Sequence, residues 1–421
     1  MFALDLPLNA RPDRGRLWER HHSTCTGRVA ARALARTAWL ATPAAPTAQR
    51  ATALLLWAWL SPALEGRWGR LRLLLAETWR HRIYAEPFLR RLRELGDIAF
   101  AFREEVYFRP RVELGPPWNT ISTASCRLQE KFRCGPRVEQ LNAALLRMVE
   151  RTRPDAVIVF RGEQIFPSTL QAIRAMGALV AGYNNDDPFG RRHAPHVWRH
   201  FLANVPTFDH LFAYRQKNVA DFHRLGAGRV TLLRSFYVRD DHFPIRDTAK
   251  DLDVSFIGHW ENDNRTDHIA AILRESAIRF GLWGTYWLAS PIAARLQERF
   301  GSIRPLGSPE YNLAINRSRI SLVFLSVLNN DTYTRRCFEI PAAGGFMLAP
   351  HTEDLASLFQ EGEEAEYFRS PDEMLDKIRF YLNHETARAR IAQAGRQRLL
   401  RDGHEALDRA RQMRDEIRQL V

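Results

Sequence analysis

Short apolar runs alternate with longer segments of helical periodicity through most of the chain. Residues 71–76 and 98–102 are the first two runs, and the helical pattern at 87–95 between them is followed by Gly96. The alternation is interrupted by a less regular stretch, residues 110–135. Further strand-like runs follow at residues 155–160, 179–183, 209–214 and 230–233. Strands that alternate with helices in this way predict a parallel sheet with helices on both faces.

A second series of the same kind begins after the short, polar segment 244–251. Its strand-like runs are residues 253–258, 278–284, 320–325 and 346–349, and residues 371–421 are helical and highly charged. The chain therefore predicts an α/β fold with two doubly wound, Rossmann-like domains and a long C-terminal helix. The expected divisions are an N-terminal extension (1–66), a first domain (67–245), a second domain (246–385) and C-terminal helices (386–421).

Length and charge agree with a two-domain globular protein. A chain of 421 residues is too long for one core. The formal charge is +13, but its arginines are scattered and form no block that resembles a nucleic-acid arm. Nucleic acid is therefore not an expected partner, whereas a phosphorylated small molecule or an anionic membrane surface is. The four cysteines form no CxxC pair and no metal-type spacing with histidine, which indicates a reducing compartment and no structural metal.

Residues 1–66 are rich in Arg and Ala, poor in acids and interrupted by prolines. They are either a loosely ordered extension or a basic, Trp-bearing amphipathic segment that makes a peripheral membrane contact. The apolar run 53–60 is far shorter than the ~20 residues of a membrane span. We expect a cytoplasmic protein.

The segment 329–350 has the features of a ligand site. It follows the strand-like run 320–325, offers cap-type side chains at 329–332, and then carries Arg336 and Glu339 on one face of a short helix. A carboxylate accepts two hydroxyl hydrogens at once, which suits the vicinal diol of a ribose. The alternative is an exposed ion pair of these two residues that contributes little.

Asp331 stands eight residues before Glu339. If the intervening segment is helical, the separation is ~12 Å, about the distance from the ribose to the sugar of a nucleotide sugar. Asp331 would then contact the donor sugar, while the nearby turn amides would face the phosphates. The alternative is that Asp331 only caps the helix.

Glycines and an arginine at strand and helix ends complete the predicted donor site. Gly258 ends the first strand of the second domain, and Arg265 just beyond it could bind a diphosphate in a fork. Gly284 is a comparable strand-end candidate for holding the base, and Gly344-Gly345 ends the helix of the motif.

Asp187 is the candidate base on the acceptor side. It belongs to the segment 184–188, which follows a first-domain strand and therefore faces the crevice; a turn role is the alternative. His193, His196 and His200 have spacings that suit a metal, but no firm acidic third ligand follows. No metal is expected.

Several of these segments resemble a known family, the spore-maturation (CgeB-like) glycosyltransferase-like proteins. The resemblance covers residues of about 70–421, and its most specific segments are 336–345, 367–373 and 391–396, with 160–162, 186–188, 218–219 and 254–258 in the family's order. It implies a GT-B fold whose second domain binds a nucleotide sugar without a metal or other cofactor. In retaining GT-B enzymes, two glutamates eight residues apart serve the donor. Glu339 matches the second of these, the ribose ligand, and Asp331 stands at the first.

The predicted function is transfer of a sugar from a nucleoside-diphosphate sugar to a glycan, protein or lipid acceptor. No match is found for the catalytic histidine that many GT-B enzymes carry, so a second class stays open: a non-catalytic nucleotide-binding or cell-envelope and spore-layer assembly protein. A nicotinamide-dependent dehydrogenase suits the alternating pattern, but no G-x-G-x-x-G turn follows any predicted strand.

Overall fold

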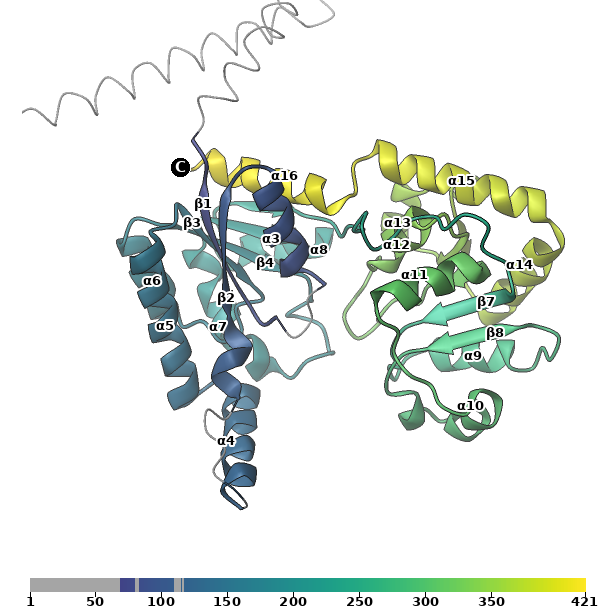
Figure 1. The fold of residues 1–421 in the computed structure, drawn as a ribbon, viewed down its shortest axis with the longest axis horizontal. Coiled ribbons are helices and arrows are strands. Elements are labelled where there is room, and N and C mark those ends of the chain that lie inside the picture. The colour runs from purple at the N-terminus through teal and green to yellow at the C-terminus, as the bar shows by residue number, and fades with distance from the viewer. Residues whose placement is uncertain (1–68, 80–82, 110–114, 116) are drawn as a thin grey trace, which may run out of the picture. The chain divides into compact units, whose positions relative to one another are not determined.

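The computed structural model describes residues 69–79, 83–109, 115 and 117–421. The predicted extension 1–66 lies outside them. Residues 71–421 form one compact unit, which contains two parallel sheets and is drawn in Figure 1. Among the described residues, no helix is both long and apolar enough to cross a membrane.

The first lobe is built on a six-stranded parallel sheet of order β2-β1-β3-β4-β5-β6. Its strands are β1 (Arg72–Glu77), β2 (Ile98–Arg103), β3 (Ala156–Phe160), β4 (Leu179–Asn184), β5 (His210–Ala213) and β6 (Val230–Leu232). Its helices are α3 (Ala85–Glu94), α4 (Trp118–Phe132), α5 (Pro136–Thr152), α6 (Pro167–Ala175), α7 (Arg199–Asn204) and α8 (Gln216–Arg224). All five residues of β3 are buried, as expected of a central strand covered on both faces.

The second lobe has a five-stranded parallel sheet of order β11-β10-β9-β7-β8. Its strands are β7 (Leu252–Ile257), β8 (Phe280–Trp283), β9 (Ser318–Leu322), β10 (Met347–Pro350) and β11 (Glu366–Phe368). Its helices are α9 (Arg265–Ile272), α10 (Ala293–Phe300), α11 (Ser308–Arg317), α12 (Arg336–Ala342), α13 (Glu353–Leu358) and α14 (Pro371–Asn383). The predicted fold of two doubly wound sheets is confirmed.

The C-terminal helical stretch continues from α14 into α15 (Glu385–Arg401) and α16 (Ala406–Arg418). Helix α16 returns to the first lobe and lies beside α3, as Figure 1 shows. Met413 and Ile417 of α16 share one hydrophobic cluster with Phe88 of α3 and with Phe338 of α12. Because one apolar cluster runs through both lobes, part of the hydrophobic burial that stabilises each lobe is made by the other.

Two elements differ from the sequence prediction. Helix α4 occupies most of the stretch 110–135 that was expected to be irregular. In the predicted site, residues 331–335 are not helical, and α12 begins only at Arg336. The N-cap residue of α12 is Arg335, which makes no side-chain cap hydrogen bond, so the polar side chains 329–332 do not cap this helix.

Candidate functional site

A cavity of about 940 Å³ lies between the carboxyl ends of the two sheets. This is where parallel α/β sheets place their ligands. First-lobe strand ends contribute Glu77, the last residue of β1, and Glu104 after β2, Arg161 after β3 and Asp186 after β4. The second lobe contributes His259, Tyr311, Asn329, Asp331, Arg335, Arg336 and Glu339.

Glu339 is a buried carboxylate on the second-lobe wall of this cavity. The Tyr311 hydroxyl donates to its Oε2 at 2.7 Å, and Arg335 donates to its Oε1 from Nε at 2.7 Å. His242 Nε2 lies 3.6 Å from Oε1. Three elements therefore hold the carboxylate: α11, α12 and the segment that links the two lobes.

Glu339 is ionised at neutral pH. Burial by itself raises its pKa, but the charges of Arg335 and His242 and the hydrogen bond from Tyr311 outweigh burial and bring it to about 2. Burial lowers the pKa of His242 itself. We therefore attribute most of the lowering of the Glu339 pKa to Arg335, because a buried histidine is mostly neutral at pH 7. The acid expected to accept a ribose diol is thus charged and held in place.

The ion-pair partner of Glu339 is Arg335, so the alternative of an exposed ion pair between Arg336 and Glu339 is wrong. Arg336 donates from Nε to the Ile257 carbonyl at the end of β7 and lies over the Phe256 ring. Among the described residues, no other acceptor contacts its guanidinium, and Arg336 lines the cavity. Its terminal nitrogens are therefore available to an anion in the cavity.

Gly258 makes room for Arg336. A Cβ added at Gly258 would lie 2.7 Å from Arg336 Nη2. The Gly258 carbonyl accepts from Trp287 Nε1 at 2.9 Å. Gly284 packs on the same backbone, because a Cβ there would be 1.9 Å from the Gly258 oxygen. Both glycines thus shape the base of the site without lining the cavity, which corrects the prediction that they contact the ligand directly.

Arg265 and Gly344-Gly345 are placed away from the cavity, contrary to the sequence prediction. Arg265 is 3 % exposed, and its guanidinium donates to Asp263, to Glu261 and to the His259 carbonyl. The guanidinium N–H groups of Arg265 therefore already have acceptors within the protein. Gly344 has a φ of +74° and ends α12, where it packs near Pro244. A Cβ on the adjoining Gly345 would come within 2.8 Å of the Ile315 side chain, so this turn serves packing.

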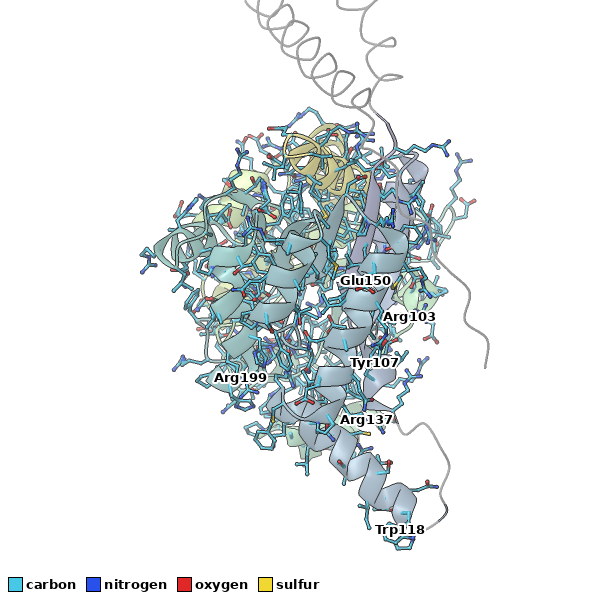
Figure 2. The ribbon with its side chains drawn as sticks, turned by 90° about the vertical axis from the view of Figure 1, so that its left-hand side faces the viewer. Arg103, Tyr107, Trp118, Arg137, Glu150 and Arg199 are labelled. Atoms are coloured by element: carbon cyan, nitrogen blue, oxygen red, sulfur yellow. The ribbon has the colours of Figure 1, made fainter. Side chains whose placement is uncertain are left out.

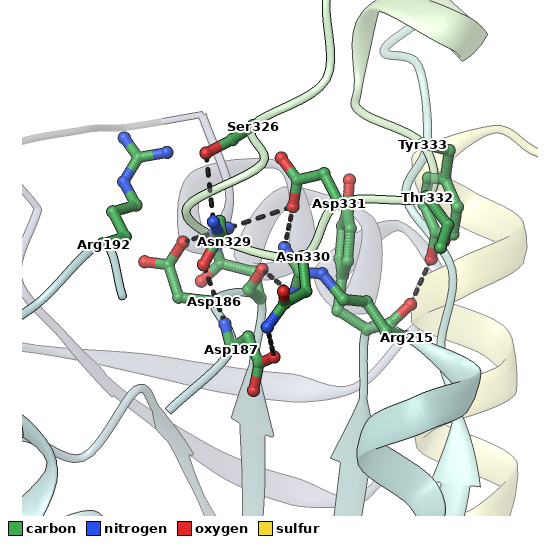
Figure 3. Close-up of polar contacts among 12 residues, drawn as sticks. Asp186, Asp187, Arg192, Arg215, Ser326, Asn329, Asn330, Asp331, Thr332 and Tyr333 are labelled. Atoms are coloured by element: carbon green, nitrogen blue, oxygen red, sulfur yellow. Dashed lines mark hydrogen bonds and ion pairs between the residues drawn. The ribbon is translucent and has the colours of Figure 1, made fainter. Parts of the chain in front are cut away.

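Asp331 lines the cavity but is bound to the first lobe. Arg215, at the end of β5, pairs with its carboxylate, and Asn329 Nδ2 donates to it at 3.0 Å. Figure 3 shows this group of side chains. Because residues 331–335 are not helical, the ~12 Å helical spacing from Glu339 does not apply. The interpretation of Asp331 as a helix cap is wrong as well, since it caps no helix.

Asp187 does not face the cavity. Its side chain is fully buried and accepts from Asn330 Nδ2 at 2.7 Å and from Asn218 Nδ2 at 2.9 Å. Its backbone N–H donates to Asn329 Oδ1 at 3.0 Å. Burial raises the pKa of Asp187, but the hydrogen bond from Asn330 and its other donors lower it below the usual value. The predicted role of general base is therefore wrong, and Asp187 instead joins the two lobes (Figure 3).

Asp186, the residue before Asp187, is the one of the two acids that lines the cavity. Arg161 pairs with it, and Asn329 Nδ2 donates to its Oδ1 at 3.0 Å. His193 lies 3.5 Å from the same carboxylate. Among the described residues, no three His, Cys, Asp or Glu side chains are arranged to hold a metal ion. Metal independence stays a prediction.

The first-lobe wall of the cavity is rich in carboxyl groups. Glu77, Glu104, Glu105 and Glu163 all line it. Burial raises the pKa of both Glu77 and Glu104 to about 8, and for Glu104 the neighbouring acids add to the effect. Glu104 Oε1 is buried and has no hydrogen-bond partner. Buried carboxyls with strongly raised pKa values, in a cleft, are typical of functional sites.

We expect Glu104→Gln to stabilise the protein at neutral pH and not in acid. The native state binds more protons than the unfolded chain between the ordinary glutamate pKa of 4.5 and about 8. Glu104 therefore lowers the free energy of unfolding increasingly as pH rises through this range, by about 3 kcal/mol near pH 7. Urea unfolding near pH 4 and near pH 7 measures the difference. Glu139→Gln, an exposed position on α5, is the control, and an effect of Glu104→Gln that does not change with pH contradicts the assignment.

Sequence reasoning missed Tyr311, Arg335 and His242, which hold Glu339, and Arg215, which holds Asp331. Tyr311 and His242 carry no local signal, because they approach Glu339 only through the tertiary fold. Arg335 could have been found, since it precedes Glu339 by four residues, a spacing that pairs side chains on a helix.

Comparison with known structures defines the fold as GT-B. Sucrose-phosphate synthase from Thermosynechococcus elongatus has a TM-score of 0.62 at 13% identity, over 83% of this chain and 99% of that one. Anabaena Alr3699/HepE, solved with UDP-glucose, gives 0.58 at 9% identity over 83% and 99%. A glycosyltransferase from Rickettsia africae gives 0.56 at 10% identity over 83% and 98%. At such identities the likeness shows the fold alone.

Sequence comparison finds a family match in the C-terminal part of the chain. Residues 265–415 match the family described as glycosyl transferase-like. This match contains α12 with Arg335, Arg336 and Glu339. No curated protein matches the chain in sequence.

Proposed function

We propose that this protein transfers a sugar from a nucleoside-diphosphate sugar to an acceptor. The observation that carries the proposal is the ionised, buried carboxylate of Glu339 beside the open guanidinium of Arg336, in a cavity at the carboxyl ends of two GT-B lobes. The glycosyl transferase-like match over this lobe and the UDP-glucose in the Anabaena structure support it.

The proposed donor site assigns one task to each group. Glu339 accepts the two ribose hydroxyls, and Tyr311 and Arg335 fix its orientation. Arg336 binds the diphosphate, where negative charge grows as the bond to the sugar breaks. Leu306 and Ser308, which line the same wall, are placed to hold the base. The acceptor then approaches from the first lobe, where Glu104 and Glu77, whose ionised fraction grows as pH approaches 8, are candidates to take its proton.

A non-catalytic nucleotide-binding or assembly protein is the second candidate. One observation favours it: Asp331, which stands where retaining GT-B enzymes have a donor-sugar ligand, is committed to Arg215. Whether the protein is an enzyme or a non-catalytic protein, membership of the CgeB-like group and a cytoplasmic location stay predictions.

Incubation with a panel of UDP- and GDP-sugars tests the proposal, with calorimetry for binding and chromatography for release of free diphosphate. Binding with slow release of UDP or GDP, accelerated by an acceptor extract, is the expected result. Binding without release from any donor favours the second candidate. Failure to bind any nucleotide contradicts both.

A further inference from the structure

Helix α4 carries an exposed apolar stripe. Figure 2 shows α4 extending outward, with Trp118 at its outer end. Trp118 is 60%, Ile121 54%, Leu128 55% and Phe132 45% exposed. Their spacings of three, seven and four residues place all four side chains on one side of an α-helix.

Apart from Phe132, whose ring centre lies 5.6 Å from that of His196, the stripe is not the surface by which α4 attaches to the first lobe. Cys126, on the other side of the helix, is the buried residue of α4. An amphipathic helix ordinarily turns its apolar side to the core, and here that side faces solvent. Exposed apolar side chains gathered on one side of a helix are typical of an interaction site.

Basic side chains border the stripe. Arg127 and Lys131 are exposed on the flank of α4, and the Lys131 ammonium lies 5.5 Å from the centre of the Phe132 ring. Exposed Arg199 lies beside the end of α4, where it donates to the Arg133 carbonyl at 2.6 Å. Glu130 is the one acid of α4, and it lines the cavity instead.

We propose that the α4 surface, made of Trp118, Ile121, Leu128 and Phe132 with Arg127 and Lys131, docks on an anionic lipid bilayer. Lipid provides both an apolar interior and a negatively charged surface, which matches the combination of stripe and flank. Tryptophan at the tip of the helix suits the interface, where its ring is half in the acyl region. A second copy of the chain would bury the stripe but would meet the same positive charges, so the bilayer is the better occupant.

Docking through α4 also fits the position of the cavity. Helix α4 has 15 residues, so it extends ~22 Å from its tip. Glu130 and Arg133, at its other end, line the cavity. A bilayer at α4 would therefore lie near the first-lobe side of the cavity.

Vesicle co-sedimentation of the full-length protein tests the proposal. Vesicles of phosphatidylcholine with phosphatidylglycerol are compared with phosphatidylcholine alone, and Trp118→Ser and Leu128→Ser are compared with wild type. Only the anionic vesicles are expected to bind strongly, and each substitution should weaken binding about tenfold. Leu400→Ser, on α15, removes an apolar side chain of similar exposure (45%) and should change nothing.

Each other outcome overturns the proposal. Equal binding of wild type and the α4 variants would place the contact elsewhere, for example in residues 1–68, which all variants share. Equal binding to both kinds of vesicle would remove the role of charge, and no binding at all would remove the surface. If sedimentation velocity finds a dimer that Trp118→Ser dissociates, the stripe is a contact between copies.

Discussion

Glu339→Gln is expected to lose about 100-fold in affinity for UDP and UDP-glucose. A hydrogen bond to a charged acceptor contributes about 1.5–3 kcal/mol, and Glu339 is expected to accept two from the ribose. The amide keeps the shape of the carboxylate but offers one oxygen acceptor instead of two. Its nitrogen or oxygen must also face Arg335, which now has no negative partner. Isothermal titration of wild type and variant measures the change.

A matched control distinguishes the loss of a specific contact at Glu339 from the loss of one negative charge in the lobe. Glu298→Gln makes the same chemical change in the same lobe, at an exposed residue of α10 that does not line the cavity. Its nucleotide affinity should equal that of wild type. If Glu339→Gln also binds as wild type does, the diol is not held by Glu339 and the assignment of the donor site fails.

Asp331→Ala should destabilise the protein by about 3–5 kcal/mol, because it leaves the guanidinium of Arg215 buried without its partner. The side chain of Arg215 is 2% exposed, and its second contact is the Asn185 carbonyl. Urea unfolding measures the change. The structure predicts this loss of stability in the absence of any nucleotide, since the pair joins the lobes.

The exposed pair of Arg317 and Asp251 provides the comparison. Asp251→Ala breaks an ion pair of the same type on the surface and should cost less than about 1 kcal/mol. A stability of Asp331→Ala close to that of Asp251→Ala, together with impaired turnover, would mean that Asp331 serves the donor sugar and not the lobe contact.

Most of the fold follows from the sequence because buried parallel strands leave a clear local pattern. The all-apolar β3 and the glycines that end helices, such as Gly177 and Gly226 with φ of +89° and +91°, are examples. Helix α4 was not predicted from the sequence, because a polar stretch of Thr and Ser separates its apolar residues and its stripe faces solvent. A helix that buries little is poorly specified by apolar periodicity.

The site was only partly predictable, because contact with the cavity is decided by tertiary structure. Glu339, Arg336 and Asp331 reach the cavity as expected. Asp187 does not, because the amides of Asn329 and Asn330 from the other lobe turn it into a lobe contact. That pairing links residues more than a hundred positions apart, and no local sequence motif indicates it. Gly258 shows the same principle, since its value lies in the space it leaves for Arg336.

A crystal structure with UDP bound is the most direct test of the proposed donor site. We predict that both ribose hydroxyls lie within hydrogen-bond distance of the Glu339 carboxylate and that Arg336 contacts the diphosphate. Density for the nucleotide elsewhere, or a ribose turned away from Glu339, would contradict it.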